Sequence, residues 1–448
     1  CGGRPRHGAF SLPQAWPQSS AADIRAMRRL SYPDLAIRLL TPFVDGEIEE
    51  ATFAQIVREA YSTFRHDAVC PIVQHGPQAY LLELFHGPTL AFKDVAMQLL
   101  ARLIDHVLAE RGQRATIVGA TSGDTGGAAI DAFAGRDRTD IFILFPHGRV
   151  SPVQQRQMTT STAANVHAIA VDGNFDDCQA LVKGMFNDHA FRDRTMLSGV
   201  NSINWGRIMA QIVYYFSSAI SLGAPDRAVS FTVPTGNFGD IFAGYAAKRM
   251  GLPVDRLVIA TNDNDILTRT LETGAYETRG VVATTSPSMD IQVSSNFERL
   301  LFEAAGRDAA AVRGYMDRLK QSGAFTIDAG HLAAIRAEFD AGRSTVEETA
   351  ATIKRILTRN SYLLDPHSAI GVQVATTIAG ASPMVVLATA HPAKFPDAVK
   401  SATGINPALP DWLSDLMSRR ENYKVLPSDL KMVEDYVSAR SRAAAERV

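Results

Sequence analysis

Short runs of β-branched and other apolar residues alternate with longer segments of helical period along the chain from residue 115 onward. The expected elements are strand 115–119, helix 126–134, strand 141–145, helix 151–160, strand 166–171, helix 176–186, helix 203–222, strand 229–233, helix 241–250 and strand 257–260. Strands that recur between helices predict βαβ units and a mostly parallel, doubly wound sheet. Ligands of such sheets bind at the carboxyl ends of the strands.

The rest of the pattern predicts three regions. Residues 24–64 have an amphipathic helical period, and residues 79–85 are expected to form a strand that leads into a loop. A Gly-Ala-Pro-Asp sequence at 223–226 breaks a long helix, and residues 302–356 predict several helices that cover a face. The expected organisation is an N-terminal region (1–85), a first α/β unit (86–222) and a second α/β unit (223–448).

Composition narrows the class of protein. The 448 residues are 46% hydrophobic and 21% charged, which excludes a disordered chain. Forty-five basic and 47 acidic residues give a net charge of −2 with no basic run, so we expect a small-molecule partner and not a nucleic acid. Three scattered cysteines, no visible signal peptide and no apolar stretch of about 18 residues favour a cytoplasmic protein without a membrane span.

The first stretch with candidate chemistry runs from Leu84 to Asp94 and precedes a segment with apolar i, i+4 rows, which predicts a buried helix. Lys93 lies at the start of this helix, in a Gly/Pro loop beside Phe85 and Phe92. Such surroundings lower the pKa of a lysine and favour an imine with an aldehyde. The alternative is a solvated lysine at an ordinary helix start.

A second stretch, Gly119 to Gly127, joins a predicted strand to a predicted helix. Free amides at the helix start, beside the hydroxyls of Thr121, Ser122 and Thr125, could hold a carboxylate or phosphate. The spacing fits neither a Walker loop nor a dinucleotide fingerprint. A capped βα turn with no ligand is the alternative.

A third stretch, Pro234 to Asp240, also lies between a strand and a helix. Gly236 and Gly239 allow close backbone approach, and the helix start adds partial positive charge, so this turn suits a phosphate. The carboxylate of Asp240 is expected to cap amides or to orient the loop.

A fourth stretch, Met384 to Phe395, reads as a buried strand that ends in Thr389 and a His-Pro pair. The Thr389 hydroxyl could face a heterocycle nitrogen, or it could bond only to backbone. Residues 365–369 suggest a turn and helix cap, and His367 is left without a functional role. No His-Glu-x-x-His pair and no Gly-x-Ser-x-Gly elbow occurs, so we expect neither a metal site nor a serine hydrolase.

Taken together, these motifs closely resemble the threonine synthase family, a group of pyridoxal-phosphate enzymes of fold type II. The resemblance rests on Gly87–Asp94, Ala120–Gly126, Gly236–Asp240 and Thr389–Phe395, and it covers about residues 30 to 405. Two further stretches, 286–291 and 294–299, resemble the bacterial and fungal subgroup. The resemblance implies two doubly wound, mostly parallel α/β units with an N-terminal region, and an active site in the cleft between them.

The resemblance also implies roles for individual residues. Lys93 would carry the Schiff base with pyridoxal 5′-phosphate. The other implied cofactor contacts are Asp124 at the ring hydroxyl, Thr389 at the pyridine nitrogen, and Gly236, Asn237, Phe238, Gly239 and Asp240 at the phosphate. The implied substrate contacts are Thr121, Ser122 and Thr125 for the carboxylate, and Asn204 and Arg207 for the substrate phosphate.

The implied reaction converts O-phospho-L-homoserine and water to L-threonine and phosphate. A dehydratase or O-phospho-lyase of the same fold and a catalytically silent homologue are the alternatives. The resemblance favours a monomer, with a dimer as the other possibility. The opening residues, Cys1 to His7, differ from the Ser-Thr-Arg-Gly segment of many members, so we expect the natural start to be lost or altered.

Overall fold

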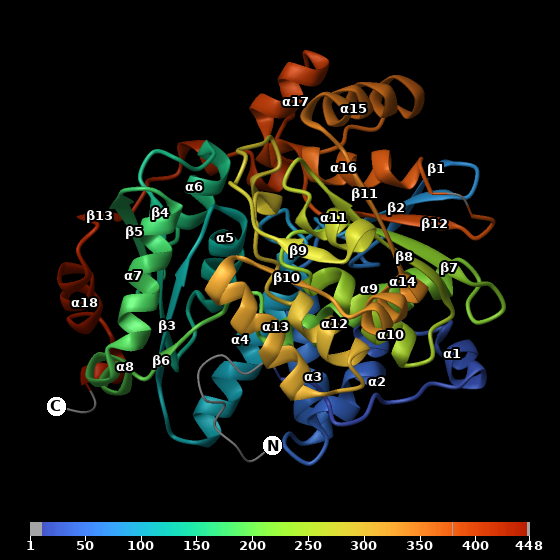
Figure 1. The fold of residues 1–448 in the computed structure, drawn as a ribbon. Helices are drawn as coiled ribbons and strands as arrows, with labels where there is room; N and C mark the ends of the chain where they lie inside the picture. The colour runs from blue at the N-terminus through green and yellow to red at the C-terminus, as the bar shows by residue number, and fades with distance from the viewer. Residues whose placement is uncertain (1–10, 379, 446–448) are drawn as a thin grey trace.

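The computed structural model describes residues 11–378 and 380–445, which form two α/β units around two separate sheets (Figure 1). The opening segment Cys1–His7 lies outside these residues. The larger sheet has the strand order β1(Ile72–Gly76), β2(Ala79–Glu83), β12(Met384–Ala388), β7(Val229–Pro234), β8(Val254–Thr261) and β11(Phe339–Arg343). Only the β1–β2 pair is antiparallel in this sheet.

The smaller sheet is entirely parallel. Its strand order is β13(Lys424–Pro427), β5(Val166–Asp172), β4(Thr139–Pro146), β3(Ala115–Ala120) and β6(Leu197–Ser198). A third, two-stranded antiparallel sheet pairs β9(Ala275–Glu277) with β10(Ala324–Thr326). The mostly parallel α/β fold expected from the sequence is therefore confirmed.

Helices surround both sheets. In the first half of the chain they are α1(Ala21–Met27), α2(Tyr32–Val44), α3(Glu50–Tyr61), α4(Lys93–Glu110), α5(Asp124–Phe133), α6(Pro152–Thr159), α7(Phe175–Asn187), α8(His189–Thr195) and α9(Trp205–Ser221). In the second half they are α10(Gly239–Arg249), α11(Ile266–Thr273), α12(Phe297–Ala304), α13(Ala309–Ser322), α14(Ala329–Glu338), α15(Val346–Asn360), α16(Pro366–Ala375), α17(Pro396–Thr403), α18(Leu430–Ser438) and α19(Arg442–Ala445), with 3₁₀ turns η1(Pro287–Met289), η2(Pro392–Lys394), η3(Asp411–Leu413) and η4(Leu416–Ser418).

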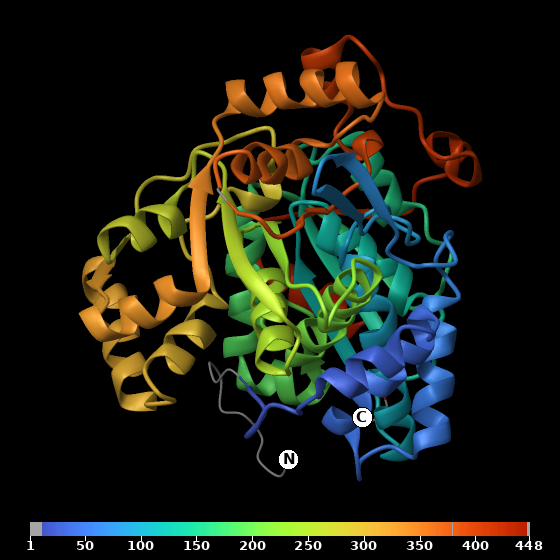
Figure 2. The ribbon, with the colours of Figure 1, turned by 90° about the vertical axis from the view of Figure 1, so that its right-hand side faces the viewer.

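Two long helices, α4 and α9, join the units at the centre of the molecule. Helix α4 packs on α3, α5 and α9, and α9 packs on α2 and α10. Their apolar rows are buried, as the i, i+4 pattern predicts. The N-terminal helices α1–α3 lie beside this pair, in blue at the lower right of Figure 2. No helix in the described part of the chain is long and apolar enough to cross a membrane.

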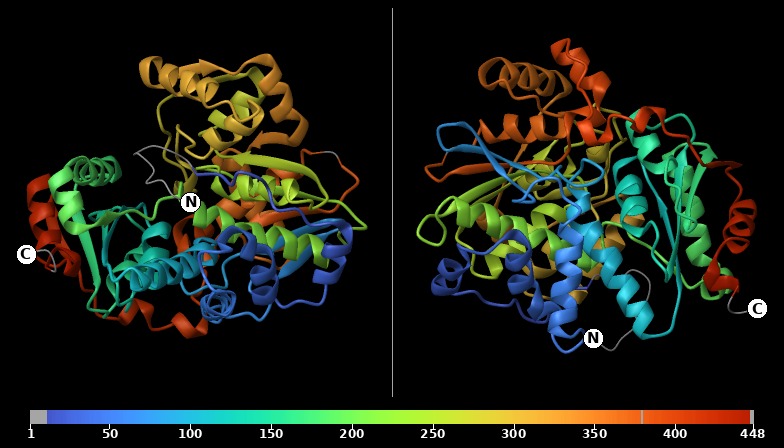
Figure 3. Two further views of the ribbon diagram at one scale, coloured as in Figure 1. Left: turned by 90° about the horizontal axis from the view of Figure 1, so that it is seen from below. Right: turned by 180° about the vertical axis from the view of Figure 1, so that it is seen from behind.

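The sheets do not follow the division at residues 85 and 222. Strands β1 and β2 fall within the expected N-terminal region, yet both belong to the larger sheet, where β2 pairs with β12. Strand β13 returns from the C-terminal part of the chain to pair with β5 in the smaller sheet, and α18 packs on α7 (Figure 3). These pairings join residues far apart in sequence, so local pattern does not reveal them.

Strand β11 is a second difference, because residues 302–356 were expected to be helical. This short strand pairs with β8 and contains Gly342. A Cβ at Gly342 would lie 2.7 Å from Val374 Cγ1, so the strand needs glycine to pack against α16. The pairing with β8, and not the local composition, determines this strand.

Candidate active site

The loop that precedes α4 brings Lys93 into the interior. Leu90 in this loop has a left-handed backbone (φ 62°), which non-glycine residues rarely adopt outside constrained sites. The Phe92 amide donates to the Thr389 carbonyl (2.8 Å), so the end of β12 supports the start of the helix. Lys93 is 8% exposed, and its Nζ lies 5.0 Å from the centre of the Phe92 ring. The lysine is buried, and the solvated alternative is wrong.

Burial and neighbouring charges together lower the pKa of Lys93. Burial lowers the pKa of Lys93, and the positive charges of Arg207 and Lys394 lower it further. The carboxylate of Asp124, with Oδ2 3.5 Å from the Lys93 Nζ, acts in the opposite direction. Because burial is the largest of these effects, the amine loses its proton more readily than an exposed lysine.

Helix α5 begins with Asp124, which is surrounded by donors. Burial alone would raise the pKa of Asp124, but Lys394 (Nζ to Oδ1, 3.1 Å) and Lys93 outweigh it and hold that pKa well below its usual range. Gln154 Nε2 donates to Oδ1 (2.9 Å), and Ser288 Oγ donates to Oδ2 (3.3 Å). Asp124 is therefore a charged carboxylate with one oxygen directed toward Lys93.

Thr121 organises the turn before α5. Its hydroxyl oxygen accepts hydrogen bonds from the amides of Gly123 and Gly126, both at 2.9 Å. The Thr121 hydroxyl therefore stabilises the turn itself, and its proton is left for a ligand. Ser122 and Thr125 are half-buried at the same turn.

The turn from Gly236 to Gly239 presents free amides. Within the described residues, no acceptor takes the N–H groups of these four positions. Phe238 has a left-handed backbone (φ 64°), which turns successive amides toward one side. Two carbonyls of the turn accept hydrogen bonds from a separate segment. Ser294 Oγ donates to the Gly236 oxygen (2.6 Å), and the backbone amide of Asn296 donates to the Asn237 oxygen (3.0 Å). This arrangement suits a phosphate.

Asp240 follows that turn, but it does not cap it. Its Oδ1 accepts from the hydroxyls of Tyr214 and Tyr215, and its Oδ2 has no partner among the described residues. The expectation that Asp240 caps amides is wrong, because two tyrosines of α9 reach the carboxylate first. Burial raises the pKa of Asp240 to about 6, although the two tyrosine hydrogen bonds and Lys93 oppose the rise.

Ser288 connects the turn to Lys93. Its carbonyl oxygen would lie 2.7 Å from a Cβ at Gly236, and its hydroxyl donates to the Asp124 oxygen that faces Lys93. The Ser288 amide donates to His367 Nε2 (3.4 Å), whose Nδ1 lies 2.9 Å from Asp365. The amine and the turn therefore line one site, and His367 supports the segment between them.

Arg207 and Asn204 lie at the start of α9. Arg207 is 5% exposed, and within the described residues the only hydrogen bond of its guanidinium goes to the Val200 carbonyl (3.3 Å). No carboxylate pairs with it there, and burial lowers its pKa to about 10. Asn204 caps the helix by accepting from the Gly206 amide (2.9 Å). A buried guanidinium without an acidic partner suits an anionic ligand.

Sequence reasoning missed three neighbours of Asp124: Lys394, Gln154 and Ser288. Lys394 stands in the fourth motif, five residues after Thr389, and it is completely buried. A lysine within a mostly apolar stretch was the sequence feature that could have identified it. Gln154 and Ser288 carry no such signal, since their roles depend on how separate loops meet.

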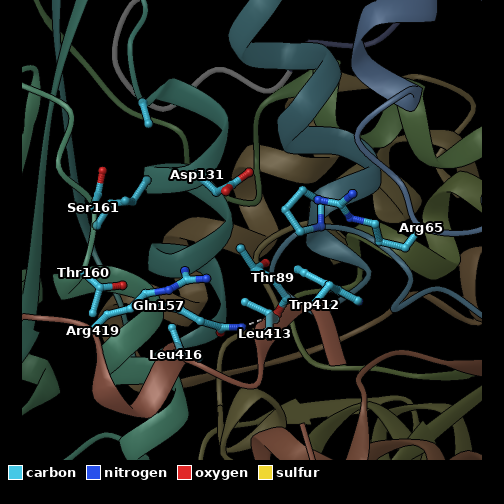
Figure 4. Close-up of a pocket in the computed structure, with 13 residues that line it drawn as sticks. Arg65, Thr89, Asp131, Gln157, Thr160, Ser161, Trp412, Leu413, Leu416 and Arg419 are labelled. Carbon is cyan, nitrogen blue, oxygen red and sulfur yellow. Dashed lines mark hydrogen bonds between the residues drawn. The ribbon is translucent and has the colours of Figure 1, made fainter. Parts of the chain in front are cut away.

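A cavity of about 290 Å³ lies behind the Lys93 loop (Figure 4). Arg65, Trp412 and Arg419 are among its lining residues, and Thr89 and Gln157 lie in its wall. Gln157 donates to the Thr89 carbonyl (3.0 Å). These two residues also contact Lys394, so they separate the cavity from Asp124.

Comparisons with known proteins agree with this geometry. Three family models match, described as threonine synthase N terminus (residues 2–61), pyridoxal-phosphate dependent enzyme (72–318) and threonine synthase, C-terminal (368–437). The chain is 52% identical to threonine synthase of Pseudomonas aeruginosa, over 96% of this chain and 92% of that protein. It is 40% identical to threonine synthase of Saccharomyces cerevisiae, over 96% and 92%.

Solved structures give the same result. A pyridoxal-phosphate-bound threonine synthase from Brucella melitensis matches with a TM-score of 0.96 and 71% identity, over 98% of this chain and 94% of that chain. Threonine synthase from yeast matches with a TM-score of 0.92 and 40% identity, over 98% and 94%.

Proposed function

The chain belongs to the threonine synthase family, and on this premise we propose that it converts O-phospho-L-homoserine and water to L-threonine and phosphate. One observation carries the choice of reaction. The site that holds the buried amine of Lys93 also contains the buried guanidinium of Arg207, which no carboxylate of the described chain neutralises. A substrate that bears its own phosphate would complete this site.

The residues present fit pyridoxal 5′-phosphate as the cofactor. The free amides of residues 236–239 would hold its phosphate, Lys93 would bind its aldehyde carbon, and Thr389 would lie at its ring nitrogen. Ser288, which touches both the turn and Asp124, supports a single ligand that spans the two. When bound, the cofactor supplies an electron sink for negative charge at the substrate Cα.

The remaining chemistry comes from the side chains. Lys93 in its neutral form can accept the proton from Cα and return it later, because burial already disfavours its ammonium form. Thr121, Ser122 and Thr125 would bind the substrate carboxylate at the start of α5. Arg207 and Asn204 would hold the substrate phosphate and later the released phosphate.

Product identity tests the reaction. With phosphohomoserine as substrate, we expect phosphate and threonine in equal amounts. Phosphate with a keto acid and no threonine would reject the synthase in favour of a phospho-lyase. Turnover of threonine itself to a keto acid would favour a dehydratase.

Two variants test the assigned residues. Lys93→Ala should abolish the visible absorbance of the bound cofactor together with turnover, whereas a catalytically silent homologue would show no turnover before the change. Arg207→Gln should lower kcat/KM for phosphohomoserine by at least about 100-fold, since it removes two charge-assisted hydrogen bonds. Unchanged kcat/KM in this variant would contradict the phosphate assignment.

We also propose that the protein works as a cytoplasmic monomer with a small-molecule substrate and without a nucleic-acid or membrane partner. Cys70 and Cys178 are both buried and unpaired, which suits a reducing compartment. Sedimentation of the purified protein at working concentration tests the monomer, and a mass of two chains would contradict it.

A further inference from the structure

Lys394 is a buried cation that the proposed reaction does not use. It ends the 3₁₀ turn η2 after β12, and its side chain is fully shielded from solvent. Burying an ammonium is costly unless charge and hydrogen bonds compensate it. Its surroundings therefore indicate what it does.

Three acceptors surround the ammonium of Lys394. The Thr89 carbonyl lies at 2.6 Å, Gln157 Oε1 at 2.8 Å and Asp124 Oδ1 at 3.1 Å. Thr89 and Gln157 accept hydrogen bonds from the ammonium, and Asp124 forms an ion pair with it. The protein itself therefore supplies the oxygen partners of Lys394, which favours a role that acts through Asp124 over direct contact with a ligand.

An ion pair and hydrogen bonds divide the two oxygens of Asp124. Lys394 and Gln154 both bind Oδ1, whereas Oδ2 faces Lys93 and Ser288. A carboxylate fixed through one oxygen cannot rotate freely. Lys394 and Gln154 together therefore hold Oδ1, which leaves Oδ2 toward the Lys93 nitrogen.

The same contacts cross between the two units. Lys394 follows β12 of the larger sheet, while Asp124 and Gln157 belong to helices α5 and α6 beside the smaller sheet. The Thr89 carbonyl belongs to the loop that leads to Lys93. Lys394 thus connects the segment after β12 with the loop that precedes α4 and with the helices α5 and α6.

We propose that Lys394 is a positioning residue of the cofactor site, which holds Oδ2 of Asp124 beside the Lys93 nitrogen and offsets the carboxylate's charge there. The proposal rests on the proposed function, because it requires the cofactor to bind Lys93. The charged groups that face Lys93 or Asp124 from neighbouring elements are Lys394 (η2), Arg207 (α9), Asp240 (α10) and His367 (α16).

The test is a pH titration of the visible absorbance of the Lys93-linked cofactor in the holoenzyme. Lys394→Met keeps an unbranched side chain that is one atom shorter and removes its charge. Without that charge, Asp124 favours the protonated nitrogen more strongly, so the midpoint should rise by about one pH unit, a tenfold increase in proton affinity. Lys400→Met, the same substitution at an exposed lysine of α17, should leave the midpoint unchanged.

A midpoint in Lys394→Met within a few tenths of a unit of the wild type, or below it, would overturn the proposal. A merely structural lysine would lower the unfolding temperature without moving this midpoint. Wild-type protein that shows no visible cofactor band would instead refute the proposed function, so the two failures are distinguishable.

A second variant covers the case in which Lys394→Met does not fold. Asp124→Asn combined with Lys394→Met removes both charges, and buried ion pairs tolerate joint replacement better than loss of one partner. Because Oδ2 is the nearer charge to Lys93, the midpoint of this double variant should fall below that of the wild type. An unchanged midpoint would show that the pair does not act on the Lys93 nitrogen.

Discussion

Asp124 and Asp240 occupy equivalent positions in the two units, yet their environments differ. Each follows a glycine at the start of a helix, directly after a turn that leaves a parallel strand, and each is buried. Asp124 meets two lysines, and its pKa is held far below the usual range. Asp240 meets two tyrosine hydroxyls, and burial raises its pKa to about 6.

The difference shows that an aspartate at the start of a helix can have either a lowered or a raised pKa, depending on its partners. The partners of each carboxyl come from distant segments. Asp124 meets Lys394, which follows β12, and Lys93 at the start of α4, whereas Asp240 meets two tyrosines of α9. In the turn before α5, the two lysines keep Asp124 negatively charged beside the amine of Lys93. Among the described residues, no lysine forms an ion pair with Asp240. This carboxylate is therefore protonated more readily than Asp124, which suits a neighbouring phosphate dianion.

The strongest test of this comparison is the loss of the Asp124 charge. Asp124→Asn leaves the buried ammonium of Lys394 without its counter-ion, so the free energy of unfolding of cofactor-free protein should fall by about 3–5 kcal/mol. Urea denaturation at pH 8 measures it. A loss below about 1 kcal/mol would mean that the lysine does not depend on this carboxylate.

The effect of the matching variant, Asp240→Asn, on the free energy of unfolding should depend on pH. The folded pKa of Asp240, about 6, lies above the ordinary 3.8, so the folded state binds a proton in this window and wild-type stability falls as pH rises from about 4 to 6. Asp240→Asn removes this loss. Relative to wild type, the cofactor-free variant should therefore gain up to about 3 kcal/mol between pH 4 and pH 7.

Urea unfolding of both proteins across this range measures the gain. The absolute stability of the variant is not the readout, because the amide replaces an oxygen that has no partner. A difference between the two proteins that stays constant with pH would contradict the raised pKa.

A third prediction concerns the phosphate turn itself. In Gly236→Ala the new Cβ would lie 2.7 Å from the Ser288 carbonyl oxygen, and this backbone must shift. We expect the cofactor Kd to rise by about tenfold or more, equivalent to roughly 1–3 kcal/mol. Gly314→Ala in α13, where a Cβ meets only Arg318 Nη1 at 3.9 Å, should leave the Kd unchanged. Equal affinities in both variants would refute the close approach.

The smallest expected effect is at Ser294, whose hydroxyl holds the Gly236 carbonyl at 2.6 Å. Ser294→Ala removes one hydrogen bond, so cofactor affinity should drop by about fivefold, near 1 kcal/mol. Equilibrium dialysis against the cofactor measures this change. A larger effect than that of Gly236→Ala would mean that the serine contacts the ligand directly.

Sequence revealed the parts of this molecule that depend on local pattern. The strands β3, β4, β5, β7 and β8 follow β-branched runs, and the buried face of α4 follows its apolar rows. Each candidate motif lies at the junction where it was expected. The site roles assigned through the family resemblance stay predictions that the variants above test.

What sequence did not reveal depends on contacts between distant segments. Strand β11 forms because β8 lies beside it, and β13 joins a sheet built some 250 residues earlier in the chain. Asp240 was expected to cap amides or to orient the loop, and the capping part was wrong because a local rule cannot anticipate two tyrosines from another helix. Lys394 was overlooked for the same reason.

The position of β12 in the larger sheet has a consequence for biosynthesis. This strand, Met384–Ala388, lies between β2 and β7, so a ribosome must translate residues 384–388 before the two earlier strands can be joined. Lys394 follows it by only a few residues. A nascent chain that stalls before this point lacks both β12 and Lys394, so it can neither complete the larger sheet nor pair Asp124 with that lysine.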